Sequence, residues 1–330
     1  MEVCGTHTMA IAKFGLRQLL PPEIELLSGP GCPVCVTSQS DIDVVLELAS
    51  HPGVTLFTFG DMLRVPGSSG SLEKVRAQGA NIVICYSPLD CLHYAFAHPQ
   101  EEVVFLGVGF ETTAPAVAVA IEQALVHKAI NFSVLSLHKR IVPALQALVS
   151  EGTGAFDGFI LPGHASSILG REPYEFLARE HKKACVITGF AAIDILLGIL
   201  MLLEQVENKS YQVEIQYKRG VNPEGNPQAL AYLAKYFTPM DSVWRGLGTI
   251  PMSGLGIAER YMEFDANKRF SLQRDERATT TACSCGEILK GLKKPEECIL
   301  FAKECTPLEP VGPCMVSSEG SCAASYHYGR

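Results

Sequence analysis

Residues 103–137 read VVFLGVGFETTAPAVAVAIEQALVHKAINFSVLSL and span one strand, one helix and a second strand. Residues 103–108 and 132–137 are almost continuously apolar, which favours strands that are buried on both faces. Residues 116–127 have the length and the composition of a helix. Because two strands joined by a helix are the repeating unit of a parallel sheet, this stretch predicts an α/β fold.

The same alternation continues in both directions from this stretch, from about residue 24 to residue 206. The other expected strands are 24–28, 54–59, 81–86, 158–161 and 184–188. The other expected helices are 41–50, 72–78, 89–98, 141–150, 173–181 and 191–206. The polar stretch HPQEE (98–102) suggests a boundary near Gln100. We therefore predict two parallel-sheet α/β domains (1–100 and 101–206), followed by an irregular C-terminal domain (207–330).

Composition excludes several classes of protein. Apolar residues make up 47% of the 330 residues, which is enough to form substantial cores and excludes a disordered chain. The net charge is 27 − 35 = −8 without a basic block, so binding to nucleic acid through phosphate neutralisation is not expected.

The chain lacks the features of a secreted or membrane-spanning protein. Its first residues, MEVCGTHTMAIAKFG, contain no long apolar stretch of the kind found in a secretion signal. The most membrane-like segment, residues 186–203, is interrupted by Gly189 and by Asp194, whose charge is costly within a bilayer. We predict a soluble, cytoplasmic protein that does not bind membranes.

Cysteine is the most informative residue type. Six of the twelve cysteines fall in the last 48 residues, at separations of 2, 13, 7, 9 and 8. These separations match neither paired zinc knuckles nor the ferredoxin spacing. In a reducing compartment such a concentration favours metal or redox chemistry over structural disulfides. The sequence thus predicts that about four of these thiols hold a metal or an iron–sulfur cluster, without identifying the metal.

Residues 29–35, GPGCPVC, form a C-x-x-C motif between an expected strand and an expected helix. A helix N-terminus stabilises thiolate, so Cys32 and Cys35 resemble a thioredoxin-like redox pair. Two alternatives remain: ordinary cysteines in a turn, and half of a zinc site.

Other reactive residues follow the carboxyl ends of expected strands, where ligands bind in parallel sheets. Glu111 and Thr112 lie in GFETTAP, and His164 lies in PGHAS. The alternatives are a helix cap for Glu111 and a backbone-bonded loop position for His164. Near the N-terminus, Cys4 and His7 could share a metal, or His7 could act as a base toward the thiol.

Taken together, the motifs resemble those of the hydrogenase maturation factor family HypD. The resemblance covers essentially the whole chain and rests on these stretches: MEVCGTHT, GPGCPVC, TFGDMLRVPG, GFETTAP, PGH, WRGLG, CGEIL and MVSSEGSC. It implies two α/β domains and a third that carries a [4Fe-4S] cluster. It also implies an assembly scaffold, rather than a conventional turnover enzyme, for the Fe(CN)2CO group of [NiFe] hydrogenases.

The resemblance implies roles for individual residues and partners. Cys4 would bind the transient Fe(CN)2CO iron, His7 belongs to the same motif, and Cys32 and Cys35 would be the redox pair. The expected ligands of the [4Fe-4S] cluster are Cys285, Cys298, Cys305 and Cys322, with Cys283 and Cys314 left over. Glu111, Thr112 and His164 would line the iron site. The implied partners are a small HypC-type chaperone, HypE as cyanide donor, and the hydrogenase large-subunit precursor.

The chain also departs from the pattern of this family. Met9 stands where many members have a second histidine, and Val36-Thr37-Ser38 stands where many have a proline. Two other functions remain as alternatives, a thiol–disulfide oxidoreductase of α/β fold and a zinc-stabilised binding module.

Overall fold

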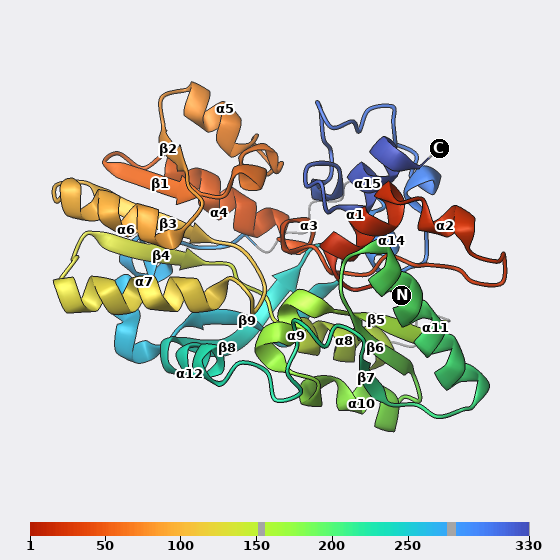
Figure 1. The fold of residues 1–330 in the computed structure, drawn as a ribbon. Helices are drawn as coiled ribbons and strands as arrows, with labels where there is room; N and C mark the ends of the chain where they lie inside the picture. Colours follow the sequence, from red (N-terminus) through yellow and green to blue (C-terminus); the bar gives the residue numbers. More distant parts are fainter. Residues whose placement is uncertain (151–155, 276–281, 330) are drawn as a thin grey trace.

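Seven parallel strands are divided between two sheets in the computed structural model, which describes residues 1–150, 156–275 and 282–329 (Figure 1). The first sheet has the order β2-β1-β3-β4 and the second has the order β5-β6-β7. The strands of the first sheet are β1 (Val54–Thr58), β2 (Asn81–Ile84), β3 (Glu102–Gly107) and β4 (Phe132–Ser136). Those of the second are β5 (Gly158–Pro162), β6 (Ala184–Thr188) and β7 (Val213–Ile215). The fold class is therefore α/β, as the sequence predicts.

Helices cover both faces of the first sheet, which explains why its strands are apolar on both sides. Leu56 and Leu106 pack into one hydrophobic core with α4 (Gln39–Ala49). Phe57 and Phe105 pack on the opposite face, in a second core with helices α6 (Pro88–Ala97) and α7 (Ala114–His127).

Four of the remaining helices match expected ones: α5 (Leu72–Ala77), α8 (Ile141–Ser150), α10 (Glu175–Arg179) and α11 (Ala192–Glu207). The others were not expected: α1 (Gly5–Lys13), α2 (Leu16–Leu19), α3 (Pro33–Val36), α9 (Gly163–Leu169), α12 (Pro227–Tyr236), α13 (Ala266–Arg269), α14 (Cys285–Leu289) and α15 (Ser321–Tyr328). The 3-10 turns are η1 (Gly60–Arg64), η2 (Glu172–Tyr174), η3 (Glu259–Phe264), η4 (Pro295–Glu297) and η5 (Pro313–Met315).

A β-hairpin that the sequence does not predict lies between the two sheets (Figure 1). It consists of β8 (Phe237–Trp244) and β9 (Gly248–Ile257), which are antiparallel. The Trp244 ring is fully buried and lies 5.9 Å from the ring of Phe110. The sequence predicts only an irregular domain here, but contacts of β9 with β4 and α8 stabilise the strands.

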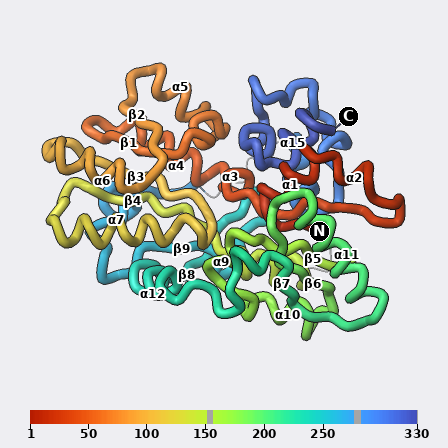
Figure 2. The backbone as a smooth tube through the Cα atoms, in the orientation of Figure 1, coloured from red at the N-terminus to blue at the C-terminus, as the bar shows by residue number. Residues whose placement is uncertain are grey.

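The two ends of the chain lie side by side. Helix α1 packs against α15 in the part of the molecule that also holds the cysteine-rich tail (Figure 2). The hydroxyl of Thr6 donates to the carboxylate of Glu319, at 2.5 Å between oxygens. The first residues of the chain are thus held against the last ones.

Two expectations about the fold differ from the structure. Residues 24–28 are not a strand, because this segment pairs with the chain start only through one isolated parallel bridge between Glu2 and Ser28. Nor do the sheets divide at Gln100: β3 pairs with β1 across that point, and the two sheets separate between β4 and β5. A polar loop between two strands is compatible with either one sheet or two, so HPQEE was not a reliable boundary signal.

Within the described residues, no helix is long and apolar enough to cross a membrane. Residues 186–203 are divided between β6 and the first part of α11.

Candidate functional site

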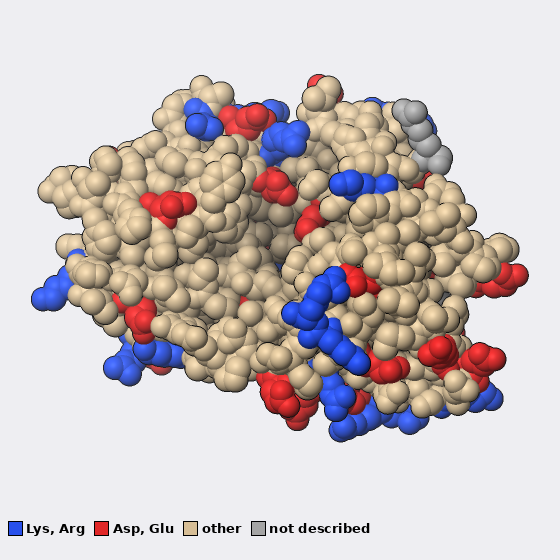
Figure 3. Space-filling view, in the orientation of Figure 1, with Lys and Arg blue, Asp and Glu red and all other residues tan. Residues whose placement is uncertain are grey.

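A cavity of ≈440 Å³ lies where the carboxyl ends of strands from both sheets meet α1 and the tail. Figure 3 shows this face hollowed near its middle, with acidic side chains at the rim. Most of the cavity wall is apolar, and the polar groups are few. They include Cys4, Thr6, Asp61, Cys85, Thr112, Thr113, His164, Ser317 and Glu319. Its size and its few convergent polar groups are typical of a ligand site.

Cys4 stands at the N-terminus of α1 and is buried in this wall. Burial and the nearby Glu319 carboxylate raise the pKa of the Cys4 thiol to about 12, while the backbone N–H groups of Thr6 and His7 oppose the rise. A thiol in this environment stays protonated until a cation displaces the proton. Cys4 can therefore act as a thiolate donor to a metal that enters the cavity.

The C-x-x-C segment lies directly beside Cys4. The backbone N–H of Gly5 donates to the carbonyl of Gly31, at 3.0 Å. A Cβ atom at Gly31 would overlap the backbone of Val3 and Cys4, so only glycine allows this approach. Pro33, which lies between the two cysteines of the motif, lines the cavity. The GPGCPVC sequence thus packs Gly31 against the Cys4 segment, while Cys32 and Cys35 themselves do not line the main cavity.

The two thiols of the motif are in close contact. The Sγ atoms of Cys32 and Cys35 are 2.7 Å apart, and Cys32 caps α3 by accepting from the backbone N–H of Cys35. Both side chains are almost fully buried. Burial, followed by the thiols of Cys314 and Cys32, raises the pKa of Cys35. The pair can therefore alternate between a dithiol and a disulfide without moving far.

Cys314 connects this pair to the tail. The 3-10 turn η5, which carries Cys314, packs against α3. Interactions with the thiols of Cys285 and then Cys35 lower the pKa of Cys314. Cys285 interacts in turn with Cys283. A continuous series of thiols therefore leads from Cys32 and Cys35 to the tail.

Five cysteines line a second and much smaller cavity of ≈10 Å³. They are Cys283, Cys298, Cys305, Cys314 and Cys322, beside the apolar residues Phe301 and Met315. Burial raises the pKa of Cys322, and the neighbouring Cys283, Cys305, Cys298 and Cys285 raise it further. The thiols that line the cavity thus surround a common space with an apolar wall, and thiolates in such surroundings are the ligands of iron–sulfur clusters. Among the described residues, no three metal-binding side chains are placed to share a single ion.

The cavity shares Cys298, Cys305 and Cys322 with the set of cysteines expected from the sequence, and differs from it in three others. Cys285 does not line it, because this thiol faces Cys314 and Cys283. Cys283 and Cys314, which the sequence interpretation left over, both line the cavity. The choice of Cys285 as a cluster ligand came from the family resemblance, and it stays a prediction.

Thr112 and His164 line the main cavity as expected, whereas Glu111 and His7 do not. Glu111 is buried and accepts the N–H of Ile141 at 3.1 Å, so it caps α8 rather than the helix that follows it. The Nε2 atom of His7 lies 2.9 Å from the hydroxyl of Thr188. Burial lowers the pKa of His7 to about 4. Both side chains therefore make structural hydrogen bonds outside the cavity, Glu111 with Ile141 and His7 with Thr188.

Sequence reasoning missed the acidic groups of the cavity, Asp61 and Glu319. Ser317 donates to Asp61 at 3.1 Å, which links the tail to the loop after β1. Both acids lie in motifs that carried the family resemblance, GDMLRVPG and MVSSEGSC. These motifs are the sequence feature that could have selected the two acids, but only the fold places both acids in one cavity.

The fold and the site define a class: α/β proteins of two parallel sheets whose strand ends enclose a cavity that contains a thiol. Comparisons with known proteins identify the family. The family described as "HypD: Hydrogenase formation hypA family" matches residues 1–329. The chain belongs to the HypD family of hydrogenase maturation factors.

Three relatives illustrate the similarity. The chain is 46% identical to hydrogenase maturation factor HypD of Rhizobium leguminosarum bv. viciae, with 100% of this chain and 88% of the relative covered. Identity to HypD of Cupriavidus necator is 45%, with coverages of 100% and 89%. Identity to HypD of Escherichia coli is 44%, with coverages of 99% and 88%.

Proposed function

We propose that this chain is the scaffold on which the Fe(CN)2CO group of [NiFe] hydrogenases is assembled, with Cys4 as the iron ligand. The observation that carries the proposal is the position of Cys4. It lies in a largely apolar cavity, beside a redox-capable thiol pair and connected by thiols to a cysteine-lined cavity. Low-spin iron with cyanide and carbon monoxide ligands favours a soft thiolate donor. An apolar cavity restricts the access of water to such a group.

The residues around the second cavity fit a [4Fe-4S] cluster. Cys283, Cys298, Cys305 and Cys322 would hold it, since Cys314 is engaged with Cys285 and Cys35. Such a cluster supplies or accepts electrons one at a time when it is bound.

The thiol series supports electron transfer between the tail and the main cavity. Cys314 has the lowered pKa that an attacking thiol needs, and it interacts with Cys35. In the proposed exchange, the Cys314 thiolate attacks the Cys35 sulfur of an oxidised Cys32–Cys35 pair, and Cys32 leaves as a thiolate. Cys285 then displaces Cys35 from Cys314. One disulfide breaks and one forms, so two electrons move from Cys285 and Cys314 to Cys32 and Cys35.

The proposal includes partners. A small HypC-type chaperone would supply a second thiolate to the iron, and HypE would donate cyanide. The hydrogenase large-subunit precursor would receive the finished group. These assignments rest on membership of the family and on a cavity that is open at the surface, where a partner side chain can enter (Figure 3).

The testing experiment is a measurement of iron, acid-labile sulfide and zinc on anaerobically purified protein, followed by infrared spectroscopy of its complex with the chaperone. We expect about four irons and four sulfides per chain, and cyanide and carbonyl bands in the complex. Zinc without sulfide would favour a zinc-stabilised binding module. Catalytic turnover of general dithiols without a partner, with no infrared bands, would favour a thiol–disulfide oxidoreductase.

A further inference from the structure

Helix α11 packs on the second sheet and lies at the outside of the molecule, yet its outer side is apolar (Figure 1). Ile193, Leu197 and Leu200 follow one another at spacings of four and three residues, so they form one stripe along the helix. Their exposed fractions are 62%, 43% and 51%, and Leu203 beside them is 42% exposed. Surface helices usually carry polar residues on this side. A contiguous apolar stripe of this kind indicates a contact surface.

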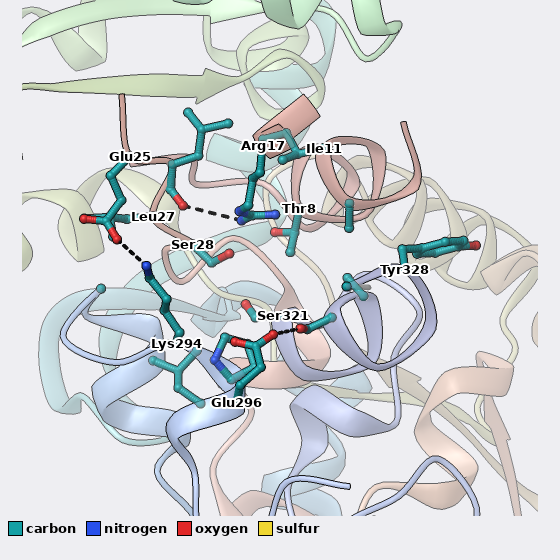
Figure 4. Close-up of a pocket in the computed structure, with 18 of the residues that line it drawn as sticks. Thr8, Ile11, Arg17, Glu25, Leu27, Ser28, Lys294, Glu296, Ser321 and Tyr328 are labelled. Atoms are coloured by element: carbon teal, nitrogen blue, oxygen red, sulfur yellow. Dashed lines mark hydrogen bonds and ion pairs between the residues drawn. The ribbon is translucent and has the colours of Figure 1, made fainter. Parts of the chain in front are cut away.

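No described segment of the chain covers this stripe. The first helices pack on the opposite side of α11, where Ile11 shares a core with Ile195 and Ile199. They are also positioned from their other side, since α1 packs against α15 and Glu25 forms an ion pair with Lys294 at 2.8 Å (Figure 4). The N-terminal segment is therefore not placed to fold over the stripe.

The two ends of α11 differ in charge. Glu204 and Glu207 are exposed in the last turn, which contains no basic residue. Carboxylates are unfavourable there because the helix dipole already places partial negative charge at this end. At the positive end, Arg219 donates to both carboxylate oxygens of Asp194, while its side chain stays 61% exposed. A guanidinium has five N–H donors, so three of them remain for an acceptor outside the chain.

We propose that the stripe is the contact between two copies of this chain, related by a twofold axis that crosses α11 between Leu197 and Leu200. In this antiparallel pair, Leu197 of one copy packs against Leu200 of the other. Ile193 lies opposite Glu204, whose methylene groups cover it while the carboxylate reaches the positive helix end and Arg219 of the other copy. A parallel pair would bring the two acidic ends together, so charge favours the antiparallel arrangement.

The proposed contact leaves the main cavity free, because no residue of α11 lines it. Both copies can therefore carry an iron group and a partner at the same time. A contact made by a single helix is smaller than a standard interface of roughly 800 Å² per partner. We therefore expect a weak dimer that dissociates on dilution.

Sedimentation velocity of the whole chain, purified anaerobically, tests the proposal over a wide range of protein concentration. We expect the sedimentation coefficient to rise from that of a monomer to that of a dimer. Leu197→Glu should weaken dimerisation by about tenfold or more, because the twofold axis buries the new charge twice in the apolar centre of the contact. Leu125→Glu, on α7, is the matched control: Leu125 is 44% exposed, and this variant should dimerise like the unaltered chain.

A second variant tests the orientation of the helices. Glu204→Lys places a cation opposite the positive end of the other helix, so it should weaken the dimer severalfold. Added salt should weaken the dimer of the unaltered chain more than that of this variant. Circular dichroism checks that each variant is folded, as expected for exposed positions.

Several outcomes would overturn the proposal. A chain that stays monomeric at every concentration does so, as does a dimer that Leu197→Glu leaves unchanged. A dimer that Leu197→Glu weakens and Glu204→Lys does not would overturn the antiparallel arrangement. A monomer whose binding to the chaperone, or to phosphatidylcholine vesicles, is weakened by Leu197→Glu would assign the stripe to that partner instead of a second copy.

Discussion

Thr6 and Glu319 are separated by 313 positions in the chain, yet the Thr6 hydroxyl donates to the Glu319 carboxylate at 2.5 Å. Thr6 belongs to the helix that follows Cys4, and Glu319 lies in the tail, three residues before Cys322. Both line the main cavity. This bond therefore joins the proposed iron ligand to the segment that contains the tail thiols.

Replacing Glu319 should loosen this junction. We expect Glu319→Ala to lower the free energy of unfolding by about 1.5–3 kcal/mol, the usual range for a hydrogen bond to a charged group. Tail cysteines should also be alkylated faster under anaerobic conditions. Denaturant unfolding and mass spectrometry of alkylated protein measure the two effects. Glu304→Ala, at an exposed tail position, is the matched control, and equal behaviour of the two variants would contradict the prediction.

Cys283 and Cys285 should differ in their effect on metal content. Cys283 lines the five-cysteine cavity and Cys285 does not. Cys283→Ser should therefore lose most of the iron and acid-labile sulfide of the purified chain, whereas Cys285→Ser should retain both. Iron and sulfide assays, together with the visible spectrum, show which of Cys283 and Cys285 is a cluster ligand. The opposite result would restore the set of ligands expected from the sequence.

Removal of Cys32 should separate redox function from cluster binding. We expect Cys32→Ala to reduce hydrogenase maturation to background, because the exchange with Cys35 and Cys314 then has no disulfide to reduce. Iron and sulfide should stay at the level of the unaltered chain. Hydrogenase activity in a host without its own factor is the readout, and Cys91→Ala, buried in the second core, is the control. Loss of cluster iron in Cys32→Ala would show that this thiol has a structural role instead.

Cys4→Ala should remove the diatomic-ligated iron. Cys4 is the thiol of the main cavity next to the C-x-x-C pair, and an alanine there offers no soft donor. The complex with the chaperone should still form, but it should lack infrared bands in the cyanide and carbonyl region. Gel filtration and infrared spectroscopy of the same sample test both parts. Unchanged bands would rule out Cys4 as a required ligand.

Glu111 should make the folded state less stable as pH rises. Burial raises its pKa to about 7, whereas an unfolded glutamate titrates near 4.3. Between these values the folded chain keeps a proton that the unfolded chain has released, so the free energy of unfolding falls as pH increases. Glu111→Gln should remove about 3 kcal/mol of this fall, the free-energy equivalent of the shift in pKa.

Urea unfolding at pH 5 and at pH 7.5 measures the Glu111 effect. Glu2, whose pKa burial also raises to about 7, contributes in the same direction in both proteins and cancels in the difference. Glu304→Gln, at an exposed position, should follow the unaltered chain. A parallel pH dependence of Glu111→Gln and the unaltered chain would show that Glu111 is ionised in the folded state.

The sequence by itself determined the α/β class and most of the elements. Near-continuous apolar runs such as residues 103–108 are compatible only with strands covered on both faces, and this property is local. The motifs were also sufficient to identify the family, because each one is a contiguous string of residues. Cys4, Thr112 and His164 were selected in this way, and all three line the main cavity.

Only the tertiary structure decided which residues meet. Whether β3 pairs with β1 or begins a new sheet depends on long-range hydrogen bonds that leave no local pattern. The same holds for the positions of Cys283 and Cys285, because Cys283 lines the five-cysteine cavity and Cys285 does not. Glu111 looked like the cap of the helix that follows it, yet it caps α8, thirty residues further along the chain. Side-chain direction and strand pairing are properties of the packed molecule, because they depend on neighbours that are distant in sequence.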